Sequence, residues 1–207
     1  MIRTEYNGTN WEFPFVSYTP SVYDKSLPLV IQLHGAGERG EGKEELHLVD
    51  VHGFSKLLVE GDYPCIVVMP QCPKDSFWVA RIESLVSFID HVIEHFGTNK
   101  SNTSLTGLSM GGYGTWYTAM AHPEMFSAIA PVCGGGMPWN AGVLNMPIWA
   151  FHGALDTVVS PACSEEMVKK LCELNKDVQF TLVPNVGHNV WENAYDVQLL
   201  KWLINDR

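Results

Sequence analysis

A serine between two glycines lies at the middle of the chain. Residues 107–111 read GLSMG, which is the spacing G-x-S-x-G, and they stand between a short apolar run that ends at Thr106 and a segment with helical character that begins at Met110. A strand that turns at once into a helix exposes the central residue, and glycines two positions before and after it remove side chains that would collide. The pattern predicts that Ser109 is a nucleophile. A glycine-rich helix start with a capping serine is the alternative.

A base and an acid follow later in the chain. His188 comes after the apolar run 178–183, and Asp156 comes just after the apolar run 148–151. A serine hydroxyl is a weak nucleophile near neutral pH, so it needs a base such as histidine, and a carboxylate orients that imidazole and stabilises its charged form. The chain order Ser, Asp, His is the order that such an architecture requires. A surface histidine and a helix-capping aspartate are the alternatives.

A tetrahedral intermediate also needs hydrogen-bond donors for its oxyanion. The backbone N–H of Met110, directly after the nucleophile, is one candidate. The other is the N–H of Ala36, in the glycine-rich segment 34–40 (HGAGERG) that follows the apolar run 29–33. A phosphate-binding loop is the alternative, but the segment lacks the G-K-[ST] and G-x-G-x-x-G patterns.

One motif points to different chemistry. His91, Glu94 and His95 match H-x-x-E-H, a zinc-protease pattern. The apolar stripe of this helical segment lies elsewhere, which leaves these side chains on or beside its polar face, and no third ligand is evident. We therefore expect a solvated helix face, no metal and no cofactor. His47 and His52 receive no role.

The elements that must position these residues alternate between strands and helices. Nearly continuous apolar runs predict strands covered on both faces, and the segments between them show the 3.6-residue period of helices. The alternation predicts an α/β fold, a mostly parallel, doubly wound sheet. The predicted strands are 29–33, 65–69, 103–106, 128–132, 148–151 and 178–183, and the predicted helices are 81–96, 110–121, 160–174 and 190–204.

Composition limits the partners. The 207 residues predict one domain over 1–207, and a net charge of −10 without a basic run argues against nucleic acid and membrane surfaces. A small-molecule ester substrate is the expected partner.

The five cysteines are odd in number and show no metal-binding spacing, so we expect them to be reduced. The first thirteen residues contain no apolar segment typical of a signal peptide, so a cytoplasmic location is expected unless a leader was removed.

The combination of motifs resembles the α/β-hydrolase superfamily, and within it the phospholipase/carboxylesterase and dienelactone-hydrolase-like group, including small esterases similar to polyhydroxybutyrate depolymerases and feruloyl esterases. The motifs are LHGAGERG (33–40), MPQCP (69–73), GLSMGGYGTW (107–116), HGALDTVV (152–159) and GHNVW (187–191). The resemblance implies Ser109, Asp156 and His188 as a catalytic triad. It implies Ala36 and Met110 as oxyanion donors, and Gln71 and Trp78 as residues that line the site.

The length of one connection bears on the substrate. Only residues 133–147 separate the strands 128–132 and 148–151, which is too short for a helical lid domain. An uncapped, shallow site favours short acyl or compact aromatic esters, and Trp191 is a candidate wall of it. The sequence thus predicts a carboxylesterase. The alternatives are an acyl thioesterase, a small peptidase of the prolyl-oligopeptidase type, and a non-catalytic receptor on the same fold.

Overall fold

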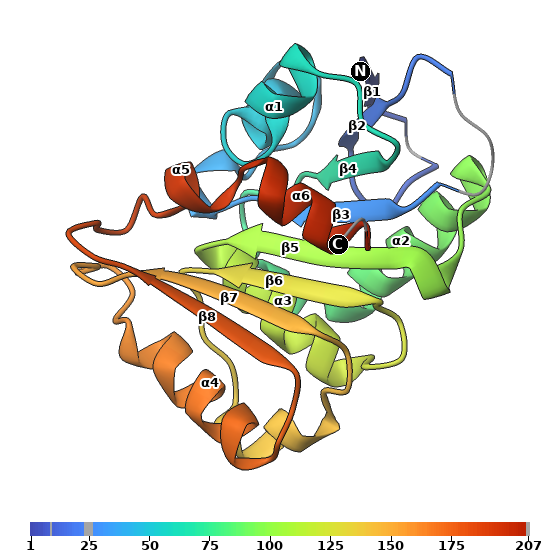
Figure 1. Cartoon of the computed structure of the whole chain (residues 1–207). Coiled ribbons are helices and arrows are strands. Elements are labelled where there is room, and N and C mark those ends of the chain that lie inside the picture. Colours follow the sequence, from blue (N-terminus) through green and yellow to red (C-terminus); the bar gives the residue numbers. More distant parts are fainter. Residues whose placement is uncertain (9, 23–26, 206–207) are drawn as a thin grey trace.

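The described residues, 1–8, 10–22 and 27–205 of a computed structural model, build a sheet of eight strands in the order β1-β2-β4-β3-β5-β6-β7-β8 (Figure 1). The first two strands pair antiparallel, β2 also pairs antiparallel with β4, and all pairs from β4 to β8 are parallel. The strands are β1 (Ile2–Tyr6), β2 (Phe15–Thr19), β3 (Leu29–Leu33), β4 (Ile66–Pro70), β5 (Thr103–Leu108), β6 (Ala128–Val132), β7 (Ile148–Gly153) and β8 (Val178–Val183).

Helices cover both faces of the sheet, as the α/β prediction requires. The helices are α1 (Ser55–Glu60), α2 (Ile82–Phe96), α3 (Met110–Ala121), α4 (Ala162–Glu173), α5 (Trp191–Ala194) and α6 (Val197–Leu203), and short 3-10 helices lie at Ala36–Glu38, Lys43–Asp50, Trp78–Ala80, Lys100–Asn102 and Pro138–Val143. Buried side chains of α2, α3 and α4 share one hydrophobic cluster, and those of α1 and α6 share another. Figure 1 shows α1 and α6 on one face of the sheet and α2 and α3 on the other.

The central strands are buried because they lie between these two clusters. Every residue of β3, β4, β5 and β6 is buried, which accounts for their nearly continuous apolar sequences. The outer strand β8 is only partly buried along its length. The parallel strands end at the same edge, so the segments that follow β3, β5, β7 and β8 meet there.

Two details of the fold differ from the sequence prediction. The predicted helix 190–204 is two helices, α5 and α6, because the Asp196 side chain accepts a hydrogen bond from the Leu199 N–H and caps a new helix. The antiparallel strands β1 and β2 were not predicted. No helix among the described residues is long and apolar enough to cross a membrane.

Candidate active site

Ser109 lies on a sharp turn between the end of β5 and the start of α3. Its backbone has φ 53° and ψ −115°, a region that residues with a side chain rarely adopt. A Cβ atom on Gly107 would overlap the carbonyl oxygen of Gly111, and one on Gly111 would overlap the carbonyl oxygen of Leu33. The two glycines therefore permit the turn for the steric reason expected from the sequence, and the turn presents the Ser109 hydroxyl at the edge of the sheet.

A continuous chain of hydrogen bonds joins three segments that are far apart in the sequence. His188 Nε2 lies 2.9 Å from Ser109 Oγ, and His188 Nδ1 lies 2.7 Å from Asp156 Oδ2. Because Nδ1 faces a carboxylate, it carries the ring hydrogen, which leaves Nε2 free to accept the Ser109 proton. The segments that follow β5, β7 and β8 thus bring a hydroxyl, a carboxylate and an imidazole together.

The environment of Asp156 keeps its side chain ionised. Burial would raise the pKa of Asp156, but hydrogen bonds from His188 and from the backbone N–H groups of Val159 and Val158 outweigh it, so the pKa lies below its ordinary value. The two N–H groups each lie 2.9 Å from Oδ1. Oδ1 is therefore held by the backbone, and Oδ2 is left to face His188.

A second histidine, His152, lies close to the same oxygen of Asp156 as His188. Its Nε2 lies 3.3 Å from Asp156 Oδ2 and 3.0 Å from the carbonyl oxygen of Val159, and its Nδ1 lies 2.7 Å from Ser164 Oγ. Because Nε2 faces two acceptors, it carries a hydrogen. His152 is fully buried. Sequence reasoning missed it, although a histidine four residues before the acid, at the end of a predicted strand, is a visible signal.

The loop after β3 is fixed by the buried His34. Its Nδ1 donates to the carbonyl oxygen of Gly35 (2.6 Å), and its Nε2 accepts a hydrogen bond from the Cys72 N–H (2.9 Å). Burial lowers the pKa of His34 to about 4, so the ring is neutral near pH 7. This arrangement positions Ala36, which begins the 3-10 helix Ala36–Glu38, beside the Ser109 turn.

A cavity of about 250 Å³ opens at the Ser109 hydroxyl. Ala36, Ser109, His188 and Trp191 are among the residues that line it. His52, which received no role from the sequence, lines it as well, and the sequence offered no signal that would have singled it out. Met110 is the first residue of α3, a position where the backbone N–H lacks an intrahelical acceptor.

Gln71 and Trp78 were expected to line the site, but they lie beneath its surface and contact the loop after β3. Both are fully buried and neither belongs to the lining of the Ser109 cavity. The Gln71 side chain donates to the carbonyl oxygens of Glu38 and Glu45 and accepts from the Gly42 N–H, which consumes its hydrogen-bonding capacity. The indole of Trp78 donates to the carbonyl oxygen of His34. The prediction that these two side chains line the site was wrong, because both form hydrogen bonds with the backbone of the neighbouring loops.

One cluster of side chains near Ser109 has the residue types of a metal site. Within the described part of the chain, one group brings three potential ligand atoms within 4.8 Å of one another, and it consists of Cys133, Asp156 and His188. Burial raises the pKa of the Cys133 thiol to about 12, so a thiolate ligand is disfavoured at neutral pH. The two histidines of the H-x-x-E-H motif have separate partners: His91 contacts Glu12, and His95 contacts the hydroxyl of Tyr6.

The sequence and the structure match those of known proteins. Residues 69–166 match the family model described as a putative esterase. The crystal structure of a thermostable esterase superposes with a TM-score of 0.81 at 28% identity, covering 99% of this chain and 62% of that one. The chain has the α/β-hydrolase fold.

Two relatives of this chain come from sequence comparison. A bifunctional acetylxylan esterase/xylanase from Neocallimastix patriciarum is 28% identical over 149 residues, which cover 69% of this chain and 21% of the fungal protein. A poly(3-hydroxyoctanoate) depolymerase from Pseudomonas fluorescens is 27% identical over 186 residues, which cover 78% of this chain and 62% of the depolymerase. The matched part thus corresponds to 21% of the length of the first relative and 62% of the length of the second. The chain is similar to enzymes that cleave carboxylic esters.

Proposed function

We propose that this α/β-hydrolase is a serine carboxylesterase in which Ser109, His188 and Asp156 act as a catalytic triad. The hydrogen-bond chain from Ser109 Oγ through His188 to Asp156, with distances of 2.9 and 2.7 Å, is the observation that carries the proposal. The similarity to esterases supports the same reaction class.

The mechanism follows from the positions of the protons. His188 Nε2 takes the proton of Ser109 as Oγ attacks the ester carbonyl carbon, and the oxyanion forms near the N–H groups of Ala36 and Met110. Collapse of this intermediate breaks the bond to the alcohol oxygen, which receives the proton from His188, and leaves an acyl-enzyme. Water then attacks the acyl group with His188 again as base, and the acid product and the free serine are restored. Asp156 holds His188 in the required tautomer and stabilises the imidazolium.

The dimensions of the site favour a small acyl group. The cavity at Ser109, about 250 Å³, lies below the usual range for sites that enclose drug-sized ligands. Residues 133–147 between β6 and β7 contain a single 3-10 helix, Pro138–Val143, in place of a lid domain. We propose short-acyl or compact aromatic esters as substrates.

Hydrolysis of p-nitrophenyl esters from acetate to long acyl chains tests this function. Ser109→Ala is expected to lower kcat on the order of 10⁶-fold, because the nucleophile is lost. Ser101→Ala, an exposed serine just before β5, is the matched control and is expected to keep the wild-type rate. An active Ser109→Ala variant contradicts the proposed nucleophile, and a rate that peaks on long chains contradicts the small acyl site.

Two further expectations from the sequence join this proposal. We propose that residues 1–207 form one domain, because the eight strands share one sheet. We also propose a reducing, cytoplasmic location, since Cys65, Cys72, Cys133, Cys163 and Cys172 are all free thiols.

A further inference from the structure

The carboxylate of Glu38 borders the cavity at Ser109. Glu38 is the last residue of the 3-10 helix Ala36–Glu38, and it lines this cavity together with Ser109. Its side chain is 15% exposed. A Cβ atom on Gly35 would lie 3.0 Å from Glu38 Oε2 and 3.7 Å from Ser109 Cβ, so the carboxylate and the serine flank the same glycine. The carboxylate therefore lies within reach of a substrate that reacts at Ser109.

The hydrogen-bonding capacity of this carboxylate is unused. Glu38 Oε2 is buried, and within the described part of the chain it has no hydrogen-bond partner. Oε1 lies 3.9 Å from His52 Nε2, and Oε2 lies 4.0 Å from His34 Nδ1, and both distances exceed that of a hydrogen bond. His34 Nδ1 donates to the carbonyl oxygen of Gly35 instead. Because a buried carboxylate oxygen without a donor is unfavourable, a partner from outside the chain would stabilise Glu38.

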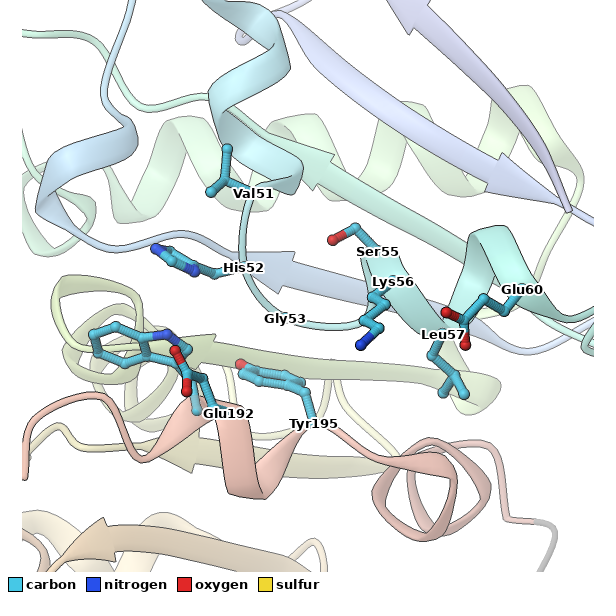
Figure 2. Close-up of a pocket in the computed structure, with 10 residues that line it drawn as sticks. Val51, His52, Gly53, Ser55, Lys56, Leu57, Glu60, Glu192 and Tyr195 are labelled. Atoms are coloured by element: carbon cyan, nitrogen blue, oxygen red, sulfur yellow. The ribbon is translucent and has the colours of Figure 1, made fainter. Parts of the chain in front are cut away.

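The lysine and arginine side chains near Glu38 have other positions or partners. Arg39 follows Glu38 directly, but its guanidinium donates to two backbone carbonyl oxygens. Lys56, which Figure 2 shows on α1, lines another cavity of about 540 Å³ and not the one at Ser109. Among the described residues, no lysine or arginine forms an ion pair with Glu38. The carboxylate thus borders the cavity without a permanent positive charge beside it.

Two further features of the protein favour a positively charged ligand. Trp191 lines the same cavity, and aromatic rings attract ammonium groups through their π electrons. The chain carries a net charge of −10, which attracts cations and repels anions at longer range. An anionic substituent in the cavity would also meet the carboxylate of Glu38. The ring and the charges therefore favour a substrate that carries a positive group.

We propose that the Ser109 cavity selects esters that carry an ammonium group, with Glu38 as the counter-ion of that group. The inference rests on the proposed esterase function. An N–H of the ammonium donates to the Glu38 carboxylate, which forms a charge-assisted hydrogen bond that a neutral ester of the same shape cannot form. The ammonium belongs either to the acyl half or to the alcohol half of the ester, since both halves lie next to Ser109 in the tetrahedral intermediate.

Two pairs of esters with matched shapes test the proposal and distinguish the two halves. In the first pair the charge lies in the alcohol: dimethylaminoethyl acetate, which is protonated at pH 7, is compared with isopentyl acetate. In the second pair it lies in the acyl group: ethyl dimethylaminobutanoate is compared with ethyl methylhexanoate, in which carbon replaces nitrogen. Each kcat/KM is divided by the rate constant of hydroxide-catalysed hydrolysis of the same ester, which removes differences in intrinsic reactivity.

The ratio of these corrected values, charged over neutral ester, is the quantity that the proposal predicts. We expect a ratio of at least about tenfold in one of the two pairs, because a hydrogen bond to a charged group is lost in the neutral ester. The pair that shows the larger ratio identifies the half of the substrate that contacts Glu38. Ratios near one in both pairs overturn the proposal.

A variant locates the preference at Glu38. Glu38→Gln keeps the size of the side chain and removes its charge, so it is expected to lower the ratio by about tenfold. A merely structural role of Glu38 would lower both rates in proportion and leave the ratio unchanged. Glu44→Gln, an exposed glutamate of the 3-10 helix Lys43–Asp50 that does not line the cavity, is the matched control and is expected to keep the wild-type ratio.

The outcomes separate this proposal from the proposed function. If p-nitrophenyl acetate is hydrolysed in a Ser109-dependent manner and Glu38→Gln keeps the wild-type ratio, the counter-ion role is refuted and the esterase function stands. If the folded protein hydrolyses none of these esters, the esterase function itself fails. If Glu38→Gln does not fold, inhibition of the wild-type protein decides: trimethylammonium is expected to inhibit hydrolysis of isopentyl acetate more strongly than tert-butanol does, and equal inhibition refutes the counter-ion role.

Discussion

Asp156→Asn replaces one carboxylate oxygen with an NH₂ group, and the structure determines where that group must point. Oδ1 accepts hydrogen bonds from the backbone N–H groups of Val158 and Val159, so the amide oxygen of asparagine must take this place. The NH₂ group then takes the place of Oδ2 and faces Nδ1 of His188. Nδ1 must become the acceptor, which moves the ring hydrogen to Nε2. In this tautomer His188 has no lone pair for the proton of Ser109.

The size of the effect follows from that tautomer. An asparagine in the acid position of a serine triad lowers kcat by about 10⁴-fold through the same exchange of donor and acceptor. Four powers of ten correspond to about 5 kcal/mol of lost transition-state stabilisation. His152 Nε2 also lies 3.3 Å from Oδ2 in the wild type, although its hydrogen-bond acceptor is the carbonyl oxygen of Val159. A second buried N–H group beside the new NH₂ group is expected to lower the free energy of unfolding by about 1–3 kcal/mol.

The assay is the hydrolysis of p-nitrophenyl acetate near pH 7.5, with the acylation burst recorded and unfolding by urea measured in parallel. Asp177→Asn, an exposed aspartate just before β8, controls for the loss of one negative charge and is expected to keep the wild-type kcat. If Asp156→Asn stays folded and keeps more than a tenth of the wild-type kcat while His188→Ala is inactive, Asp156 does not set the tautomer of His188. That result would refute the reasoning above.

Variants at three further positions test other parts of the structure. Burial lowers the pKa of His34 from 6.5 to about 4, so between these pH values the unfolded chain binds a proton that the folded chain does not. The free energy of unfolding therefore falls as the pH drops, by up to about 3 kcal/mol. His34→Asn is expected to reduce the slope of the free energy of unfolding against pH, and an unchanged slope between pH 7 and 4 contradicts this prediction. His152→Leu removes the hydrogen bonds of the ring to Ser164 Oγ and to the carbonyl oxygen of Val159, and the ring nitrogen 3.3 Å from Asp156 Oδ2, so it is expected to lower kcat and the free energy of unfolding, the latter by about 1–3 kcal/mol. His152→Gln keeps a donor and is expected to lose less of both, and equal losses in the two variants argue against the hydrogen bond. Gly111→Ala places a Cβ on the carbonyl oxygen of Leu33 and is expected to abolish activity and expression as folded protein; a well-folded variant by circular dichroism contradicts this steric assignment.

The parallel part of the fold was predictable because strands that are buried on both faces have nearly continuous apolar sequences. The predicted strands 29–33, 128–132 and 178–183 coincide with β3, β6 and β8. The strand β1 lacks such a mark, since most of its residues are exposed and its sequence IRTEY contains no apolar run. Its place is decided by pairing with β2, a tertiary contact that local periodicity does not reveal.

The sequence indicated the triad candidates better than the residues that line the cavity. The residue types of Ser109, Asp156 and His188 fit a nucleophile, an acid and a base, their chain order fits the architecture, and each follows the end of a strand. Wall residues carry no such signal: Trp78 and Trp191 are both tryptophans close to motifs, yet Trp78 is fully buried and Trp191 lines the cavity. Which of two aromatic side chains faces a cavity depends on packing from distant segments.

The turn at Ser109 is attached to its neighbouring strands by backbone hydrogen bonds. The N–H of Ser109 donates to the carbonyl oxygen of Val132 at the end of β6, and the N–H of Cys133 donates to that of Phe151 in β7. The backbone conformation of Ser109 is thus linked by hydrogen bonds to the middle of the sheet. Loss of ester hydrolysis on heating is therefore expected to follow the opening of the sheet. Local unfolding of surface helices at lower temperature is expected to leave the rate of hydrolysis unchanged.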